Sequence, residues 1–299
     1  MISYITKKKT GFYEGHAIMI QIQKLGFSYD GSKSPALKNI SMDIEDGDFL
    51  GIIGASGAGK TTLSCAINGI IPHHYKGEYY GKVLVNKKDV FDTNPCELAL
   101  EVGSVFQDVE SQITNTVVED EILFGLENFG IDKSEIFQRL EWAMKKTGIE
   151  NLREREISSL SGGQKQKVAI ASIIALRPKI LVLDEPTGEL DPVASRNIFS
   201  ILRELNEDYG MTIIVIEQKI MLLGEYARHL AVMDNGTLLY HGKTREILMH
   251  SKKLLELGVN CPRVVTFYDE LAELGTVNKE KDQICINIEE AKKLVEEKL

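Results

Sequence analysis

The sequence contains little cysteine and no long apolar run. Its four cysteines, Cys65, Cys96, Cys261 and Cys285, are scattered without close pairing, which favours reduced thiols over disulfides or a zinc site. No run of about eighteen apolar residues occurs, so we expect no membrane-spanning helix. The first ten residues include three lysines but neither an apolar core nor a cleavage site, so we expect no secretory signal. These absences predict a soluble, cytosolic protein.

The sequence also has fewer basic than acidic side chains. The chain has 44 acidic and 35 basic side chains, a formal net charge of −9. A surface that follows nucleic-acid phosphates needs clustered Lys and Arg, so this balance argues against broad nucleic-acid binding. Hydrophobic residues make up 43% of the chain and charged residues 26%, which is typical of a globular protein and not of a disordered one. The 299 residues allow one large domain or two modest ones.

Short apolar segments predict an α/β fold. Residues 18–23 alternate apolar and polar side chains, the pattern of a half-buried strand. Three further runs have the apolar or β-branched composition of strands buried in a parallel sheet: Phe49–Ile53, Ile180–Leu183 and Thr212–Ile216. The Asn235-Gly236 step, between two apolar segments, predicts a β-hairpin.

Helical spacing replaces strand spacing between about residues 108 and 176. Ile122, Leu126 and Phe129 fit one helix face, and residues 136, 140 and 144 fit another, so we expect a helical insertion within the α/β core. Beyond Thr244 we expect two amphipathic helices, with apolar faces formed by Phe267, Leu271 and Leu274 and by Ile288, Ala291 and Val295.

The segment 54–61 matches the phosphate-binding pattern G-x-x-x-x-G-K-[ST] and stands between a predicted strand and a predicted helix, as that pattern requires. Its glycines let backbone N–H groups curl around phosphate oxygens, and the helix N-terminus adds positive potential. Lys60 should reach the β- and γ-phosphates, and the Thr61 hydroxyl should bind Mg²⁺. An ordinary glycine-rich turn is the alternative. The expected nucleotide contacts are Gly54, Ser56, Gly57, Gly59, Lys60, Thr61 and Thr62.

A second part of such a site follows the apolar run that starts at Ile180. Asp184 could hold Mg²⁺, through water, and Glu185 could orient or deprotonate the attacking water. Taken alone, an apolar strand that ends in Asp-Glu is more often followed by an ordinary solvated loop. Together with Lys60, however, the pair favours a nucleotide site.

A second potential anion site is the segment Leu160-Ser161-Gly162-Gly163-Gln164, directly before a predicted helix. A serine and two glycines at a helix N-terminus provide exposed amides and a favourable dipole. One chain needs a single γ-phosphate site of its own, so a second suggests that this chain completes a site on another subunit. Here the sequence resembles the ATP-binding-cassette (ABC) ATPases, whose signature motif is Leu-Ser-Gly-Gly-Gln.

The resemblance covers about residues 18–243 and implies a P-loop (RecA-like) α/β core, an N-terminal antiparallel β subdomain, a helical subdomain and a small C-terminal extension. The implied boundaries are 1–17 for an N-terminal extension, 18–245 for the cassette with its helical subdomain at about 108–170, and 246–299 for the C-terminal extension.

The resemblance also implies ATP and Mg²⁺ as cofactors and a head-to-tail dimer. Each ATP would lie between the Lys60 loop of one chain and residues 161–164 of the other. Tyr29 matches the aromatic residue that stacks on adenine, the alternative being an ordinary core or edge tyrosine. Gln107 matches the glutamine that contacts Mg²⁺ and water, and Asp191 matches the aspartate of the loop exchanged across the dimer.

One position departs clearly from the family. After the strand that ends at Ile216, the family places a histidine that contacts the γ-phosphate, and Gln218 stands here instead. Glutamine can donate a hydrogen bond and position water, but it cannot carry a proton or a charge. Gln218 would then weaken the site built on this chain's own phosphate loop, which favours a heterodimer with unequal sites. The alternative is that Gln218 substitutes adequately, because Glu185 is retained.

The segment 106–125 resembles the ATPases of energy-coupling-factor (ECF) importers. That resemblance implies an ATP-hydrolysing subunit at the cytoplasmic face of the membrane that powers uptake of a vitamin or a metal ion. Its implied partners are a second ATPase chain, a membrane coupling subunit and a substrate-capturing membrane subunit, with no nucleic acid. The tail after Thr244 resembles an extension that contributes to ATPase pairing, the alternative being a simple helical cap.

Two other functions compete. A non-transport ABC ATPase is opposed by the single cassette and the acidic charge. A nucleotide-gated subunit with weak turnover is favoured by Gln218 and opposed by Glu185. Adjacent His73 and His74 have no other ligands nearby in the sequence, so we expect surface residues there and not a metal site.

Overall fold

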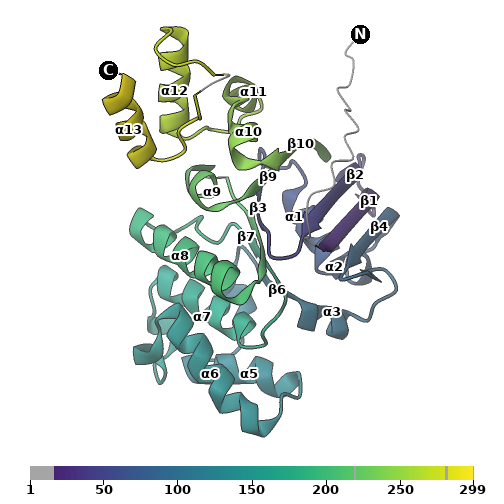
Figure 1. Cartoon of the computed structure of the whole chain (residues 1–299). Coiled ribbons are helices and arrows are strands. Elements are labelled where there is room, and N and C mark those ends of the chain that lie inside the picture. The colour runs from purple at the N-terminus through teal and green to yellow at the C-terminus, as the bar shows by residue number, and fades with distance from the viewer. Residues whose placement is uncertain (1–16, 219, 280–281, 299) are drawn as a thin grey trace.

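The computed structural model describes residues 17–218, 220–279 and 282–298. The expected N-terminal extension, except Ala17, lies outside the described residues. The described chain forms a four-stranded and a six-stranded sheet with helices around them (Figure 1). The expected α/β architecture, with an antiparallel sheet near the N-terminus, is confirmed.

The smaller sheet has the strand order β2-β1-β4-β5 and is antiparallel throughout. Its strands are β1 (Ile18–Tyr29), β2 (Leu37–Glu45), β4 (Gly77–Val85) and β5 (Lys88–Asp89). The predicted alternation holds from Ile20 to Gln23, where Ile20 and Ile22 are buried and the glutamines are more exposed, but Ile18 is exposed and Met19 is buried.

The larger sheet has the order β10-β9-β3-β8-β7-β6, and its strands are β3 (Phe49–Ile53), β6 (Val102–Val105), β7 (Ile180–Asp184), β8 (Thr212–Ile216), β9 (His229–Asp234) and β10 (Thr237–Lys243). Strands β9 and β10 form the predicted hairpin, and the other neighbours are parallel. Every residue of β3, β7 and β8 is buried, as expected for central strands covered on both faces.

The register brings three strand ends together. Ile216 of β8 lies between Ile52 of β3 and Asp184 of β7. Because these strands are parallel, the segments that follow them emerge at one edge of the sheet. The phosphate-loop motif, Glu185 and Gln218 therefore share that edge.

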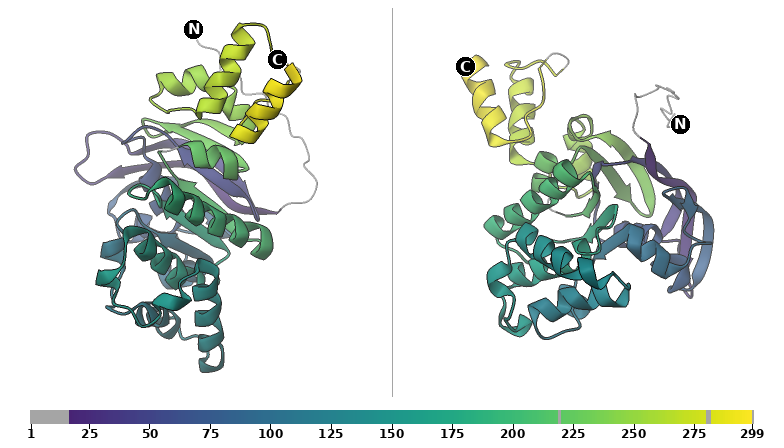
Figure 2. Two further views of the ribbon diagram at one scale, coloured as in Figure 1. Left: turned by 90° about the vertical axis from the view of Figure 1, so that its left-hand side faces the viewer. Right: turned by 60° about the horizontal axis from the view of Figure 1, so that its bottom comes forward.

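Helices cover both faces of the larger sheet. They are α1 (Lys60–Ile67), α2 (Ile70–His73), α3 (Pro95–Glu101), α4 (Val109–Gln112), α5 (Val118–Asn128), α6 (Lys133–Thr147), α7 (Gly162–Ile174), α8 (Pro192–Tyr209), α9 (Ile220–Tyr226), α10 (Thr244–Leu248), α11 (Ser251–Glu256), α12 (Arg263–Glu273) and α13 (Ile288–Lys298). Helix α1 and the smaller sheet pack on one face, α7, α8 and α9 pack on the other, and α5 and α6 pack against α7. The predicted helical insertion is confirmed by α4 to α7, which lie at the end of the molecule opposite α12 and α13 (Figures 1 and 2).

The two predicted C-terminal helices are present, but the predicted faces are partly wrong. Leu274 falls just after α12 and is 79% exposed, and Ile288 of α13 is 62% exposed. The buried apolar residue of α13 is Leu294, and a two-bond ion pair from Arg245 of α10 to Glu290 attaches the helix. Periodicity identified the helices but could not tell which side faces a neighbour. Among the described helices, none has the length and apolarity that crossing a bilayer requires.

Candidate nucleotide site

The phosphate-loop motif forms the turn between β3 and α1, as the sequence predicts. Two of its glycines are required by the chain itself. Gly54 has a φ of +156°, and a Cβ there would lie 2.2 Å from the Met233 carbonyl oxygen. Gly59 has a φ of +95°, and a Cβ there would lie 2.6 Å from the Ala36 carbonyl oxygen. Any side chain at either position would force the loop away from the strands that support it.

Lys60 is held at this loop. Its side chain is buried, and its Nζ donates to the carbonyl oxygens of Gly54 (2.9 Å) and Ala55 (3.0 Å). Burial lowers the pKa of the ammonium, and the carboxylates of Glu185 and Asp184 act in the opposite direction. The ammonium therefore lies between the loop backbone and two acidic residues. An anionic phosphate bound there would stabilise its charged form.

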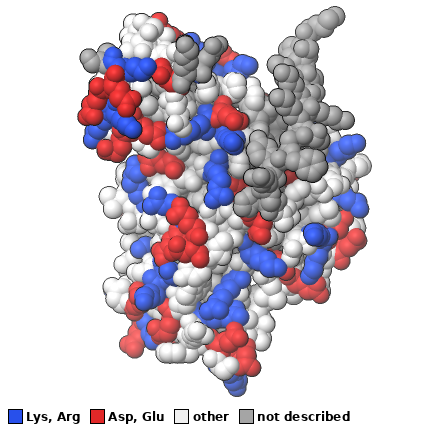
Figure 3. Space-filling view, viewed as in Figure 1, with Lys and Arg blue, Asp and Glu red and all other residues white. Residues whose placement is uncertain are grey.

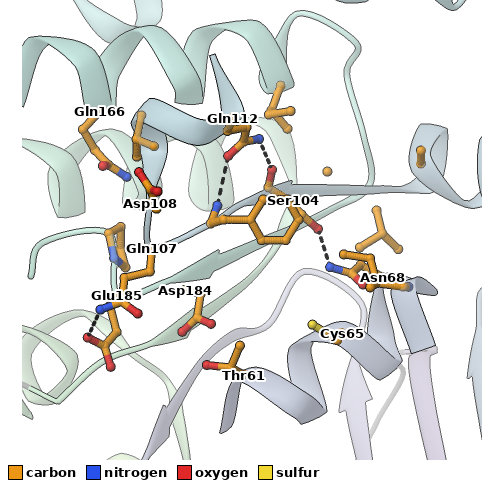
Figure 4. A pocket seen from close by; sticks show the side chains of 18 of the residues that line it. Thr61, Cys65, Asn68, Ser104, Gln107, Asp108, Gln112, Gln166, Asp184 and Glu185 are labelled. Atoms are coloured by element: carbon orange, nitrogen blue, oxygen red, sulfur yellow. Dashed lines mark hydrogen bonds between the residues drawn. The ribbon is translucent and has the colours of Figure 1, made fainter. Parts of the chain in front are cut away.

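Asp184, at the end of β7, has the character expected of a cation ligand. It is 3% exposed, and its Oδ1 has no hydrogen-bond partner among the described residues. Burial raises the pKa of its carboxyl, the negative charge of Glu185 adds to that rise, and the Thr61 hydroxyl and Lys60 oppose it. A buried carboxylate oxygen that lacks a partner is costly, so a cation beside Oδ1 would be stabilising. Figure 4 shows Asp184 and Thr61 on adjacent elements of the site.

These oxygens fit Mg²⁺, which binds through one or two protein oxygens plus substrate phosphates. Among the described residues, no group of three or more His, Cys, Asp or Glu side chains could hold a metal alone. Asp184 and Thr61 would therefore need the phosphates of a bound nucleotide to complete a magnesium site.

Glu185 is held between two glutamine side chains. Gln218 Nε2 donates to Glu185 Oε1 (2.7 Å), and Gln107 Nε2 donates to Glu185 Oε2 (3.1 Å; Figure 4 shows the Gln107 bond). Glu185 also has a left-handed backbone, with a φ of +49°. Such strain in a residue other than glycine is commonly found at functional sites. The structure thus brings together the three residues that the sequence assigned to catalysis from separate segments.

Tyr29 ends β1 beside α1. Its hydroxyl lies 3.1 Å from the Thr62 Oγ1, and its ring makes edge contacts with Phe27 and Tyr75. The side chain is half-buried, and burial raises the pKa of its phenol. The structure therefore places Tyr29 next to the helix that follows the phosphate loop, and stacking on adenine stays a prediction.

The signature segment is built differently. Ser161 and Gln164 form a capping box at the start of α7, in which each side chain bonds the other residue's backbone N–H. Ser161 and Gly162 are exposed. A Cβ at Gly162 would find its nearest neighbour 3.8 Å away, at Leu190, and one at Gly163 would lie 3.4 Å from the Ala194 Cβ. Neither glycine has a positive φ, so the chain itself hardly restricts these positions.

Asp191 caps the next helix, α8. Its Oδ1 accepts the backbone N–H groups of Val193 (2.8 Å) and Ala194 (2.9 Å), and the residue is exposed.

An open groove of about 1460 Å³ contains the side chains that could bind Mg²⁺ and part of the signature segment. Its lining residues include Thr61, Gln107, Asp184, Glu185 and Gly162.

Glu217 was missed by the sequence analysis. It follows β8, is 1% exposed, and its Oε1 accepts the Thr187 backbone N–H (3.0 Å) and the Thr187 hydroxyl (2.5 Å). A charged residue directly after a fully apolar strand was the available signal. Its partner lies 30 positions earlier in the chain, so the sequence alone could not identify it.

Comparisons with known proteins agree with this geometry. The ABC transporter family model matches residues 37–188. A protein of Pyrococcus abyssi, named as an ABC transporter ATP-binding protein, is 38% identical over 87% of this chain and 93% of its own length. YkoD of Bacillus subtilis, named for HMP/thiamine import, is 35% identical over 88% of this chain and 48% of its own length.

Two solved structures have the same architecture. CbiO1 of Clostridium perfringens, described as part of the ABC transporter complex CbiONQ, has a TM-score of 0.72 and 31% identity, covering 84% of this chain and 99% of CbiO1. The cassette MJ0796, a dimer in a post-hydrolysis state with ADP and Pi, has a TM-score of 0.67 and 26% identity, covering 76% of this chain and 99% of that cassette. With the family match and the relatives at this coverage, the chain belongs to the ATP-binding proteins of ABC transporters and is an ATPase.

Proposed function

We propose that this chain is the ATP-hydrolysing subunit of an ECF-type importer and powers uptake of a vitamin or a metal ion. The observation that carries the proposal is the likeness to CbiO1, which is part of CbiONQ. The similarity to YkoD, named for HMP/thiamine import, supports an importer of a vitamin. The expected position is the cytoplasmic face of the membrane, held there by membrane subunits.

In the proposed reaction each residue near the sheet edge has one task. Lys60 and the loop amides, including those of Gly57 and Thr62, bind the phosphates, and Tyr29 stacks on adenine. Glu185 takes the proton of the attacking water, and Gln107 and Gln218 orient both the carboxylate and the water. When bound to Asp184 and Thr61, Mg²⁺ would neutralise charge that develops on the phosphate oxygens.

The second half of the site would come from another chain. Residues 161–164 of one subunit would cover the nucleotide bound by the Lys60 loop of its partner, in a head-to-tail dimer. The exposure of Ser161 and Gly162 supports this role, because the amides at the start of α7 are accessible. Gln218 leaves this chain's own site without a titratable group at that position, so we propose a second, different ATPase chain as partner.

The membrane coupling subunit would dock in another part of the same groove that contains the nucleotide-site residues. The groove combines residues near α2 and α3 with the segment after β6, and Gln166 of α7 lines it as well. The Gln166 Nε2 is buried and has no partner among the described residues. Because this donor is buried, it would have to turn toward the groove before a docked carbonyl oxygen could accept from it.

The proposed division of the chain follows from these roles. Residues 18–245 form the cassette with its helical subdomain at about 108–170, and residues 246–299 form an extension that pairs with the other ATPase. An apolar groove of about 460 Å³ between α12 and α13, lined by Phe267, Ile288 and Val295, supports a pairing surface. On the face shown in Figure 3, Lys and Arg alternate with Asp and Glu over the described residues, which agrees with the absence of a nucleic-acid partner from the proposal.

The test is purification of the complex from native membranes and identification of the accompanying proteins. A second ATPase and two membrane proteins would support the proposal, and ribosomes or DNA would contradict it. Gln218 favours the alternative function of a nucleotide-gated subunit with weak turnover. Measuring ATP affinity and turnover in the same complex distinguishes this alternative from an active ATPase. Turnover that stays near zero when the second ATPase is present would favour that alternative.

A further inference from the structure

A continuous set of contacts connects the phosphate loop with the signature segment inside this one chain. It begins at Glu217, whose backbone N–H donates to the Ile52 carbonyl oxygen (3.2 Å), two residues before the loop glycine Gly54. The Glu217 side chain then holds Thr187 through both its backbone N–H and its hydroxyl. A buried carboxylate is thus fixed between the strand that carries the phosphate loop and the segment that follows Glu185.

Thr187 in turn fixes the position of Leu190. The Leu190 backbone N–H donates to the Thr187 carbonyl oxygen (3.2 Å), which closes a turn. The Leu190 side chain lies beside both signature glycines, because a Cβ at Gly162 or Gly163 would be 3.8 or 3.9 Å from its Cδ2. The same turn leads directly into Asp191 at the start of α8.

The end of β8 therefore holds the 185–188 segment at several points. The Ile216 carbonyl oxygen accepts the Glu185 backbone N–H (2.9 Å), Gln218 donates to the Glu185 carboxylate, and Glu217 accepts from Thr187. The first two bonds fix the expected base. The Glu217 bonds fix Thr187, and a separate bond from the Gly188 N–H to the Glu185 carbonyl oxygen (3.1 Å) closes the same segment. From Thr187 the contacts continue through Leu190 toward residues 161–164. Two hydrogen bonds from Thr187 to the same Glu217 oxygen restrict both the position and the rotation of Thr187.

We propose that Glu217 is a positioning residue that couples the two ATP sites of the dimer. It transmits the state of this chain's own phosphate loop to Leu190 and, through it, to the signature segment that the chain presents to its partner. Coupling through packed and hydrogen-bonded neighbours of this kind changes with mutation by about 2- to 30-fold in the linked equilibrium. The inference rests on the proposed head-to-tail pairing but not on the type of transporter.

The test compares Glu217→Ala, Glu217→Gln and Thr187→Val in the full-length chain by hydrogen–deuterium exchange, with and without the ATP analogue AMP-PNP. For Glu217→Ala we expect several-fold faster exchange at residues 187–191 and 161–164, while AMP-PNP still protects the phosphate loop. Glu217→Gln keeps an oxygen that can accept from Thr187, so it should restore slow exchange at both segments. Thr187→Val, which loses one of the two bonds, should fall between them.

Asn206→Ala is the matched control. Asn206 is buried and donates to the carbonyl oxygens of Gly47, Asp48 and Met211, at the opposite end of the same strands. Its loss should destabilise the chain without speeding exchange selectively at 161–164. Two results would overturn the inference: faster exchange at 187–191 alone with 161–164 unchanged, or an equal increase everywhere, as in the control.

Turnover gives a second, independent measurement. In the complex purified from native membranes, Glu217→Ala should lower the kcat for ATP by roughly tenfold and leave the KM within about twofold, because nucleotide binding uses the intact phosphate loop. Glu217→Gln should recover most of the kcat. An unchanged kcat in Glu217→Ala would contradict the coupling. Copurification of ribosomes or DNA would contradict the transporter type and leave the exchange results in force.

Discussion

The two glycine-containing segments that we propose as anion sites differ in how far the fold itself requires their glycines. In the phosphate loop, Gly54 and Gly59 have positive φ angles, and any Cβ would meet backbone oxygens at 2.2 and 2.6 Å. In the signature segment, Gly162 and Gly163 have ordinary backbone angles, and a Cβ would make only contacts of 3.4 Å or longer. The first pair is needed by the fold. The second pair has no such need, which agrees with the proposal that a partner's nucleotide approaches it.

The largest expected effect is on stability, at a glycine that the fold of the phosphate loop requires. Gly59→Ala combines an unfavourable φ with a backbone clash, so we expect a loss of about 2–5 kcal/mol in the free energy of unfolding. Urea denaturation of the full-length chain measures this loss. Gly31→Ala is a suitable control, because Gly31 has a similar φ of +76° but no atom within 4 Å of a Cβ. If the Gly59 and Gly31 variants were equally stable, the clash with the Ala36 carbonyl oxygen would not explain the requirement for Gly59.

Gly162→Ala tests the opposite side of the comparison. We expect the stability of the chain to change by less than about 0.5 kcal/mol, because the position is exposed and uncrowded. ATP hydrolysis by the purified complex should nevertheless fall by roughly 10- to 100-fold, because the methyl group would keep the partner's phosphate from the α7 amides. A variant with normal hydrolysis would show that nothing approaches this glycine closely.

Gln218→His changes one site and leaves the other intact. The substitution adds a titratable group beside Glu185 but does not alter residues 161–164, so we expect turnover at this chain's own phosphate loop to rise by several-fold to about tenfold. Steady-state ATPase activity of the complex measures the gain. No gain would mean that the glutamine already serves fully, and the two sites would then be equivalent.

The smallest effect lies away from both sites. The Asp48 carboxylate raises the pKa of His229 through a hydrogen bond to Nδ1 (2.9 Å), against the effect of burial. Because the pKa is higher in the folded chain, this pair stabilises the protein fully below the unfolded pKa of about 6.5 and ceases to do so as the pH rises through the folded pKa.

We expect the pair to contribute about 1 kcal/mol at acidic pH. The measurement is the difference in unfolding free energy between the native chain and His229→Gln, followed from pH 5.5 to 8.5. The neighbouring His241 has a pKa lowered first by burial and then by His229, and it changes stability in the opposite direction; the burial effect is present in both proteins and cancels in the difference. A difference that stays constant across this pH range would contradict the assignment to His229.

Local patterns predicted the parts of this molecule that depend on neighbours in sequence. The phosphate loop, the helix that follows it and the Asn235-Gly236 hairpin all form as expected, because turn chemistry and residue spacing determine them. Gln107 and Gln218 were assigned to the site through the family resemblance, and the structure places both against Glu185.

Features that depend on tertiary packing were not predictable in the same way. The sheet order cannot be derived from strand composition, since β3, β7 and β8 are equally apolar. The apolar side of α13 was predicted only in part, because Ala291 packs against the core whereas Ile288 is exposed and Leu294 is buried. The bond between Glu217 and Thr187 joins two residues that are neither adjacent nor part of a known pattern.

The strand order also determines when this protein can first work during its synthesis. Strand β3 carries the phosphate loop, but its neighbours β8 and β9 come far later; Phe49 pairs with Ile213, roughly 160 residues onward. A ribosome must therefore release most of the chain before β3 has any partner in its sheet. The segment 37–188, by which the family is recognised, lacks both of those strands. The strand that carries the phosphate loop therefore has both of its neighbours only in a piece of the chain that extends through β9.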